Sequence, residues 1–268
     1  MPQLTHADET IRRGVAVVTG AGAGLGRAIA VELTRRRIKV SGFGRRKAAL
    51  EATADLTEAG LFIPKVVDVS DDDAVRTAFA ELRGEAGDVT ILFNNAAVYP
   101  RLDFLQETPA SFMKSVQVNL GGVVSCTHAA LETMSQTGVG RIVNVGSFAD
   151  LAPLPCSAAY SVSKGAARIL TLALVADLSD RFPDIIISTW MPGVLATGMG
   201  LPDGLDPAVA ARWGANLALW HDRSLNGVVF HRDHEVLHRR SLKRRIKDRI
   251  LLRKTQAPRQ LGGDASLI

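Results

Sequence analysis

The chain has 268 residues, of which 47% are apolar, and it carries a formal net charge of +5. A chain of this length can bury a full hydrophobic core, so a single main domain is expected, and no run of about 18 uncharged apolar residues is available to cross a membrane. The first residues, MPQLTHADETIRR, lack the basic flank and apolar centre of a signal peptide. A soluble cytoplasmic protein is therefore expected.

The positive charge lies near the end of the chain. Between Arg239 and Lys254 there are nine Lys or Arg residues and one Asp, so this stretch carries +8 and the rest of the chain sums to −3. We predict one domain over residues 1–233 and a basic extension over 234–268, helical from Glu235 to Lys254. A nucleic-acid partner is not expected. A solvated or subunit-packed extension is expected, while binding of an anionic membrane surface by the extension stays open.

Short runs rich in Val and Ile alternate with helical patterns along the chain. Strands that are apolar without alternation are buried on both faces, as in a parallel sheet covered by helices. The pattern predicts an α/β fold with a doubly wound parallel sheet of about seven strands in three layers. The predicted strands are 15–19, 39–43, 63–67, 89–93, 141–145, 185–190 and 227–230. The predicted helices are 25–36, 47–59, 71–83, 109–135, 157–181 and 206–220.

A glycine-rich stretch, TGAGAGLG at 19–26, lies between the first predicted strand and the first predicted helix. Backbone N–H groups and the positive end of a helix dipole can hold a pyrophosphate there, and a side chain would block its approach. The spacing differs from the tighter dinucleotide fingerprint. A tight turn for close packing of helix on strand is the alternative. The stretch 195–206, LATGMGLPDGLD, is predicted to be a loop.

Tyr160 and Lys164 lie four residues apart in a predicted helix, so both side chains project from one face. A phenol titrates near 10, and a nearby ammonium lowers that pKa, which would suit Tyr160 to act as a general acid and base. Ser147 follows a predicted strand at the carboxyl edge of the sheet, where ligands of such sheets bind. A Tyr and a Lys on a half-exposed helix, and a turn serine, are the structural alternatives.

Seven short motifs occur in order along the chain: TGAGAGLG at 19–26, DV at 68–69, NNAA at 94–97, VNL around Asn119, IVNVGS ending at Ser147, YSVSK at 160–164 and PGVLAT at 192–197. The series resembles the short-chain dehydrogenase/reductase family, from about residue 14 to 230. The resemblance implies a Rossmann-type fold and a catalytic set of Asn119, Ser147, Tyr160 and Lys164.

The resemblance also implies the role of each residue. Tyr160 would exchange the proton and Ser147 would stabilise the substrate oxygen. Lys164 would hold the nicotinamide ribose, and Asn119 would hold a water in a proton relay. Asn94 and Ala96 would line the adenosine ribose, and Asp68 would accept a hydrogen bond from the adenine. The predicted cofactor-binding residues are Gly20, Gly24, Leu25, Gly26, Arg45, Asp68, Val69, Asn95, Ala96, Tyr160, Lys164, Pro192, Gly193, Val194 and Thr197.

Cofactor preference is predicted from the end of the second strand. An acidic residue there would bind the adenosine ribose and repel a 2′-phosphate, but Gly44 fills the position and Arg45 follows. A guanidinium suits phosphate, so NADP(H) is favoured over NAD(H). The alternative is that Arg45, Arg46 and Lys47 only begin the next helix in solvent.

The predicted activity is NADPH-linked reduction of a carbonyl on a hydrophobic small molecule. An alcohol dehydrogenase working in the oxidative direction and a nucleotide-binding protein without redox turnover are the alternatives. Arg101 could bind a carboxylate, and a homodimer or homotetramer is expected. The candidate substrate residues are Val98, Tyr99, Phe148, Leu151, Leu154, Leu195, Met199 and Leu201.

Three departures from the family pattern bear on these expectations. Ala97 stands where the family usually has Gly, the residues after the last strand differ, and the basic extension follows. The extension includes HEVLH at 234–238, which matches the H-E-x-x-H pattern of zinc proteases. No metal is predicted, because the last strand should end there and no third ligand has a recognisable spacing. Cys126 and Cys156 are expected as free thiols.

Overall fold

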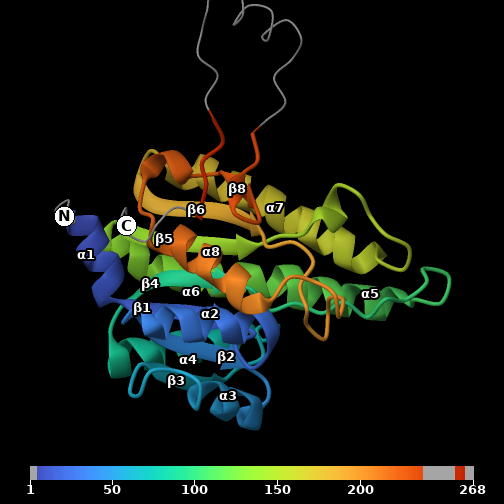
Figure 1. The fold of residues 1–268 in the computed structure, drawn as a ribbon, viewed down its shortest axis with the longest axis horizontal. Coiled ribbons are helices and arrows are strands. Elements are labelled where there is room, and N and C mark those ends of the chain that lie inside the picture. The colour runs from blue at the N-terminus through green and yellow to red at the C-terminus, as the bar shows by residue number, and fades with distance from the viewer. Residues whose placement is uncertain (1–4, 238–256, 263–268) are drawn as a thin grey trace, which may run out of the picture.

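The computed structural model describes residues 5–237 and 257–262 of the chain. In this part of the chain, eight strands hydrogen-bond side by side in a single sheet (Figure 1). Seven are parallel and the short last one is antiparallel, so the predicted doubly wound parallel sheet is confirmed with one additional edge strand. Across the sheet the strands are β3 (Phe62–Val66), β2 (Lys39–Gly44), β1 (Val15–Thr19), β4 (Val89–Asn94), β5 (Val139–Val145), β6 (Asp184–Met191), β7 (Val229–His231) and β8 (His234–Glu235).

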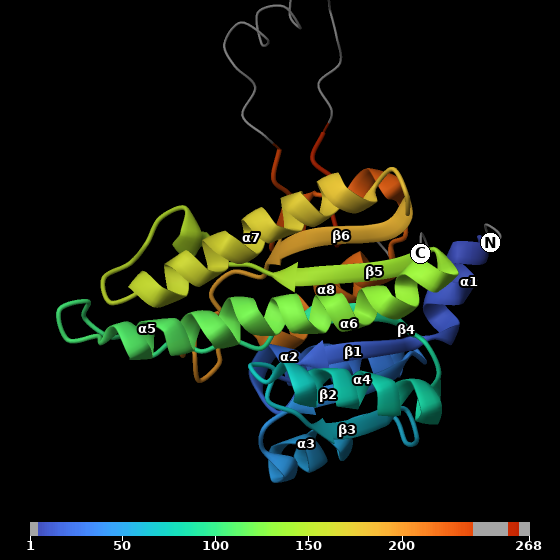
Figure 2. The ribbon, with the colours of Figure 1, turned by 180° about the vertical axis from the view of Figure 1, so that it is seen from behind.

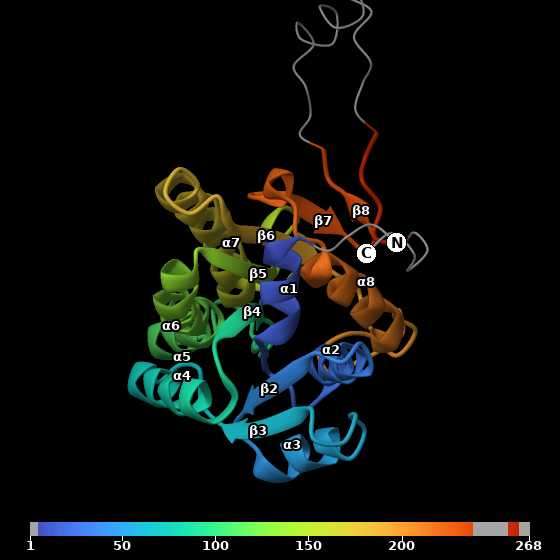
Figure 3. The same ribbon diagram turned by 90° about the vertical axis from the view of Figure 1, so that its left-hand side faces the viewer.

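Helices cover both faces of the sheet and make the three predicted layers. The α-helices are α1 (His6–Arg13), α2 (Gly24–Arg35), α3 (Lys47–Ala54), α4 (Asp72–Ala86), α5 (Pro109–Val116), α6 (Gly122–Thr137), α7 (Ala158–Leu178) and α8 (Pro207–Leu219). Figure 3 shows α2 and α8 on one side of the sheet and α4, α6 and α7 on the other. Each side has its own cluster of buried apolar residues. The central strands β1, β4, β5 and β6 are buried on both faces, which explains why they read as continuous apolar runs.

Short polar signals set several helix ends. Asp71 caps α4 by accepting from the Ala74 N–H, and Thr108 caps α5 ahead of a proline at its first position. Gly138 ends α6 with a φ of 73°, a left-handed conformation that glycine adopts without steric cost. These caps satisfy backbone groups that the helices leave unpaired.

Three elements differ from the sequence prediction. The helix α1 was not predicted, and the single helix expected over 109–135 is divided by a π-helical segment at Gln117–Gly121. The predicted basic helix was to begin at Glu235, but that residue lies in β8, so its start is corrected from helix to strand. The remainder of that predicted helix lies outside the described residues.

A short segment at 257–262 packs back on the edge of the sheet beside β8 (Figure 3). Arg259 pairs with Glu235 at 2.7 Å, and Leu261 is only 2% exposed within the core. Arg259 and Leu261 lie beyond residue 233 and still pack on the main domain. The division into 1–233 and 234–268 stays a prediction. In a strand, His234 and Glu235 do not have the helical spacing that a zinc protease needs, and His238 lies outside the described residues.

Two further observations concern the described residues alone. None of the helices in 5–237 is long and apolar enough to cross a membrane. Within the same part of the chain, no cluster of three or more His, Cys, Asp or Glu side chains could hold a metal ion. Cys126 is a buried free thiol and Cys156 an exposed one.

Candidate active site

The parallel strands all end at the edge of the sheet that faces α5, where Figure 2 shows the arrows of β5 and β6 pointing. The glycine turn follows β1, the NNAA segment follows β4, and the loop with Thr197 follows β6. Ser147 comes two residues after β5, and Tyr160 lies at the start of α7. The topology therefore brings the predicted motifs to one edge, as expected for a doubly wound sheet.

Tyr160, Ser147 and Lys164 form the centre of this site. The Ser147 hydroxyl lies close enough to the Tyr160 phenol to act on it, and this contact favours a lower pKa for Tyr160. The Ser147 oxygen also accepts from the Ala149 N–H at 3.2 Å, which fixes the turn after β5. Lys164 is buried one helical turn after Tyr160, and its amine donates to the Val145 carbonyl at 2.8 Å. Two hydroxyls thus meet at the point where a substrate oxygen would bind.

Burial controls the charges in this centre. Burial raises the pKa of Tyr160 above its usual 10.0 and outweighs the hydrogen bond from Ser147, while the nearby Tyr99 raises it further. Burial also lowers the pKa of Lys164 to about 8. The predicted lowering of the phenol's pKa by Lys164 is wrong for this structure, because the amine is directed to the Val145 carbonyl and lies 5.8 Å from the centre of the Tyr160 ring. The Tyr160 phenol is therefore neutral at neutral pH, as an unperturbed tyrosine also is.

Asn119 lies in the π-helical segment and is fully buried. Its amide donates to the Val98 carbonyl and to the Ser163 hydroxyl, each at 3.0 Å, and its oxygen accepts from the Val98 N–H at 2.8 Å. Ser163 in turn donates to the Tyr160 carbonyl at 2.8 Å. The residue therefore links the loop after β4 to α7. Its predicted role in holding a water stays a prediction. Single π-helical turns inside α-helices are often found at functional sites.

A cavity of about 210 Å³ lies beside the glycine turn, between the ends of β1 and β2. Gly20 and Gly24 have φ values of 71° and 53°, which only glycine adopts readily. A Cβ at Gly24 would lie 3.2 Å from Thr197. The helix α2 begins here without a side-chain cap and without an acidic residue in its first turn, so its first N–H groups are available to an anion. These features fit the diphosphate of a nicotinamide dinucleotide.

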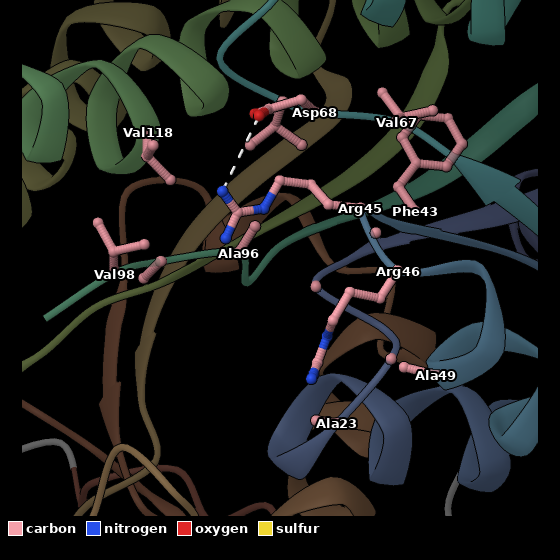
Figure 4. A pocket seen from close by; sticks show the side chains of 15 residues that line it. Ala23, Phe43, Arg45, Arg46, Ala49, Val67, Asp68, Ala96, Val98 and Val118 are labelled. Atoms are coloured by element: carbon pink, nitrogen blue, oxygen red, sulfur yellow. Dashed lines mark ion pairs between the residues drawn. The ribbon is translucent and has the colours of Figure 1, made fainter.

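Figure 4 shows three charged side chains around this cavity. Arg45 reaches across it and pairs with Asp68 at 4.0 Å, while Arg46 points toward Ala23 at the start of α2. Burial alone would raise the pKa of Asp68, but hydrogen bonds from Ser70 and the charge of Arg45 hold it below its usual value. Two guanidinium groups and one carboxylate therefore border the end of the cavity nearest β2.

The other predicted cofactor residues occupy distinct positions. Leu25 and Gly26 lie in the first turn of α2, where a Cβ on Gly26 would come within 2.3 Å of the Gly20 carbonyl oxygen. Gly26 thus permits close packing of the helix on the glycine turn, which is also expected if the turn serves packing alone. Ala96 and Val69 line the cavity. Pro192, Gly193, Val194 and Thr197 follow β6, with Thr197 facing Gly24. Their roles as cofactor ligands stay predictions.

The two asparagines of the NNAA segment differ. The Asn95 N–H donates to the Thr19 hydroxyl at 2.9 Å, and its side-chain amide donates to the Thr19 carbonyl at 2.8 Å, which fastens the segment to the glycine turn. Asn94 is buried and donates to Thr127 and Asn144. It does not line the cavity, so the expected contact of Asn94 with the ribose is corrected to a structural hydrogen bond.

The predicted substrate residues divide into three groups. Val98, Tyr99 and Met199 line a second cavity of about 560 Å³, next to the first. Leu195 is 7% exposed and belongs to the core. Phe148, Leu151, Leu154 and Leu201 are exposed on the loops after β5 and β6. Arg101 donates to the carbonyls of Met199 and Gly200, at 2.8 and 3.3 Å, so in this structure it joins two loops.

Two features of the site were not singled out from sequence. The sequence pattern indicates Arg46 only as part of a solvated helix start, and the adjacent Arg45 is the signal that points to it. Asp150, three residues after Ser147, forms an ion pair with Arg168 on α7, and its side chain is 2% exposed. This pair ties the turn that carries Ser147 to the helix that carries Tyr160. No local pattern indicates such a pairing in advance.

The comparisons with known proteins agree with this geometry. A family model described as short chain dehydrogenase matches residues 14–205. The chain is 34% identical over 223 residues to a D-erythrulose reductase of Gallus gallus, covering 83% of this chain and 87% of the relative. It is 35% identical over 202 residues to carbonyl reductase [NADPH] 2 of Sus scrofa, covering 74% and 78%.

A solved structure of a short chain dehydrogenase from Bacillus anthracis has the same fold. It superposes with a TM-score of 0.75 at 19% identity, covering 82% of this chain and 95% of that one. The family match and the identity to the relatives carry the assignment further than the fold alone. The chain belongs to the short-chain dehydrogenase/reductase family and is an oxidoreductase that acts on CH–OH or C=O groups with NAD(P)(H).

Proposed function

We propose that this protein reduces the carbonyl group of a hydrophobic small molecule with NADPH. The observation that carries the proposal is the pairing of a buried, neutral Tyr160 with Ser147, at the same sheet edge as the glycine cavity. A phenol whose pKa is raised stays protonated at neutral pH and can give its proton to a developing alkoxide.

The residues of the chain would divide the work as follows. When bound, the cofactor supplies a hydride to the substrate carbon. The Tyr160 hydroxyl transfers its proton to the substrate oxygen, and the Ser147 hydroxyl donates a hydrogen bond to that oxygen as its charge grows. Lys164 titrates at about 8, near enough to neutral pH to return a proton to Tyr160. The buried Asn119 network holds α7 in place beside the cofactor site.

The preference for NADPH is supported by charge at the end of β2. Gly44 leaves no carboxylate to bind a ribose or repel a phosphate, and Arg45 and Arg46 both line the cavity. Guanidinium groups bind phosphate through two parallel hydrogen bonds. The name of the Sus scrofa relative, carbonyl reductase [NADPH] 2, agrees with this preference.

The class of substrate is supported by the second cavity. Its walls include the apolar residues Val98, Pro100, Leu102 and Met199, together with the charged Arg45 and Lys114. Pockets for small molecules are mostly apolar with a few polar groups that fix orientation. Both relatives named above are reductases by name, one of D-erythrulose and one of carbonyl compounds, which supports a carbonyl as the reacting group.

A substrate panel tests the proposal. Purified protein is mixed with NADPH or NADH and a series of ketones and aldehydes, and the absorbance of the reduced nicotinamide is followed. We expect turnover of apolar ketones with NADPH. Turnover of alcohols alone, with the oxidised cofactor, would favour the oxidative alternative. Tight NADPH binding without turnover of any carbonyl or alcohol would favour a nucleotide-binding protein without redox activity.

We also propose that the protein is a homodimer or homotetramer. Val162, Ile169 and Leu172 are 55%, 59% and 42% exposed and share one face of α7, and Val124 on the neighbouring α6 is 46% exposed. An apolar face of this kind is stabilised by a partner surface. Light scattering after size exclusion should give at least twice the mass of 28.6 kDa. A monomer at micromolar concentration contradicts the proposal.

A further inference from the structure

The chain contains two tyrosines, and they stack on each other. The rings of Tyr99 and Tyr160 lie with their centres 4.5 Å apart and their planes 17° apart. Tyr99 comes from the loop after β4, and Tyr160 from the start of α7. Nothing in the local sequence requires the two rings to meet, so this contact is made by the tertiary fold. An offset stack of two aromatic rings contributes beyond the area that it buries.

Arg101 holds Tyr99 in this position. The guanidinium carbon lies 5.2 Å from the centre of the Tyr99 ring, and one guanidinium nitrogen, Nη2, donates to the carbonyls of both Met199 and Gly200. Arg101 itself has a φ of 55°, in the left-handed region that residues other than glycine seldom adopt. Such a conformation persists where the surrounding contacts enforce it, and it is concentrated at functional sites. Arg101 thus contacts the Tyr99 ring and the loop after β6 at the same time.

Tyr99 also lines the second cavity, together with Val98, Pro100 and Met199. Its ring therefore contacts the Tyr160 ring and also borders the second cavity. We propose that Tyr99, held by Arg101, is a positioning residue for Tyr160: it fixes the orientation of the catalytic ring and keeps water away from it. This inference rests on the proposed function of Tyr160 as the proton donor.

The charged and titratable groups around Tyr160 decide the sign of the effect. Ser147 after β5 donates or accepts at the phenol, Lys164 lies on the same helix, and Tyr99 and Arg101 come from the loop after β4. His231 of β7 packs edge-to-face against Phe148, the residue that follows Ser147. The neighbouring Tyr99 phenol contributes to the raised pKa of Tyr160, after burial. Removing the Tyr99 hydroxyl should therefore make Tyr160 ionise at lower pH.

Because both tyrosines lie in the site, tyrosinate absorbance reads the pair directly. Wild-type protein, Tyr99→Phe and Tyr160→Phe are titrated with alkali in the presence of NADP⁺, and circular dichroism marks the range in which each stays folded. Each variant reports the remaining phenol. We expect the sum of the two single curves to lie at lower pH than the wild-type curve. A sum that superimposes on the wild-type curve means that the phenols are independent, and it overturns the inference.

Kinetics separate positioning from simple packing. Tyr99→Ala should lower kcat on the order of tenfold, with KM for NADPH unchanged, because a displaced acid slows proton transfer without affecting the cofactor site. Tyr99→Phe keeps the ring and should restore most of kcat, with the alkaline limb of the rate profile moved to lower pH. Arg101→Gln should behave like a weaker Tyr99→Ala.

The two levels of the proposal fail separately. If the wild-type protein turns over no carbonyl substrate, the proposed function is wrong, while the titration still tests the coupling of the phenols. If the wild-type protein is active and Tyr99→Ala has unchanged kcat and an unchanged pH profile, the positioning role is wrong and the proposed function stands. Met113→Ala, at an exposed residue on α5, is the matched control and should change neither the titration curve nor kcat.

Discussion

The two ends of the ligand-binding edge are built in opposite ways. At the reaction centre the polar groups are buried: Asn119 and Ser163 are inaccessible, and Lys164 is 4% exposed. At the adenosine end the charged groups stay in solvent, with the Arg45 and Asp68 side chains 64% and 42% exposed. Burial strengthens electrostatic interactions and shifts pKa values, whereas water and salt weaken those between exposed charges. Under the proposed function, burial sets the chemistry, and screened charges set the choice of cofactor.

This contrast predicts a range of effects. Substitutions at the buried end should change rates or stability strongly, and those at the exposed end should change cofactor selectivity modestly. The buried end also has a thermodynamic cost, because the Lys164 amine and the Asn119 amide lose their contacts with water and regain only a few hydrogen bonds. The exposed end has no such cost. Each prediction below tests one side of this difference.

The largest effect is expected at Tyr160. Tyr160→Phe removes the proton donor and should lower kcat on the order of 10³-fold, while the affinity for NADPH stays near that of the wild type. The retained ring keeps its stack on Tyr99, so the loss reports the hydroxyl alone. Steady-state rates and a fluorescence titration of the cofactor provide the two measurements. Full activity in this variant would remove the catalytic assignment.

Buried strands and the polar helix α1 differ in how far the sequence predicts them. The strands were predicted to within two residues, because buried parallel strands leave uninterrupted Val and Ile runs. The motif residues came to one edge because the topology requires it. By contrast, α1 buries only Ile11 and has a polar sequence, although its capping box of Thr5 and Asp8 was a usable signal.

Other features depend on contacts that no local pattern contains. The two-residue strand β8 exists because β7 and the segment at 257–262 pair with it. The π-helical segment interrupts a continuous helical pattern where Asn119 reaches Val98 and Ser163. The raised pKa of Tyr160 follows from burial, which the spacing of Tyr160 and Lys164 cannot reveal. The sequence predicts which residues meet, and much less how they are solvated.

Lys164 gives the next largest effect, and the effect is on stability. Its pKa is about 8 in the folded protein against an ordinary 10.5, so the unfolded chain binds the proton more tightly. Below about pH 8 the buried ammonium thus destabilises the fold, and this penalty fades as the pH rises from about 8 to 10.5. The full cost of burying the ammonium is about 3 kcal/mol. Replacing Lys164 removes this cost, but it also removes the hydrogen bond to Val145, which stabilises the fold by about 1 kcal/mol.

Lys164→Met should therefore be inactive and yet more stable than the wild type by about 2 kcal/mol at neutral pH. Denaturant unfolding at neutral pH and at a pH of about 10 measures the difference, which should shrink at the higher value. Lys47→Met, at a side chain that is 78% exposed, is the control and should change the stability little. A Lys164→Met protein that is less stable at neutral pH would contradict the cost assigned to burial.

At the exposed end, Arg45→Ala and Arg46→Ala should each raise KM for NADPH about tenfold and leave KM for NADH nearly unchanged, because only NADPH presents a phosphate to the guanidinium groups. The effect should become smaller as salt is added. Lys47→Ala is the matched control, because Lys47 follows both arginines in sequence and is absent from the cavity wall. Equal changes for both cofactors would leave Arg45 and Arg46 as solvated residues at the start of α3.

The smallest effect is expected at Asp68, whose carboxylate lies 4.0 Å from Arg45. Asp68→Asn frees Arg45 from this ion pair, so the ratio of KM for NADH to KM for NADPH should rise by about threefold or less, as expected for an exposed pair. A lost contact with adenine would raise both KM values together and leave the ratio unchanged. Ser70→Ala removes a hydrogen bond to Asp68 without changing its charge, so it should not alter the ratio. A ratio that falls in Asp68→Asn would mean that the carboxylate orients Arg45 toward the phosphate, and the ion pair would then belong to the binding site itself.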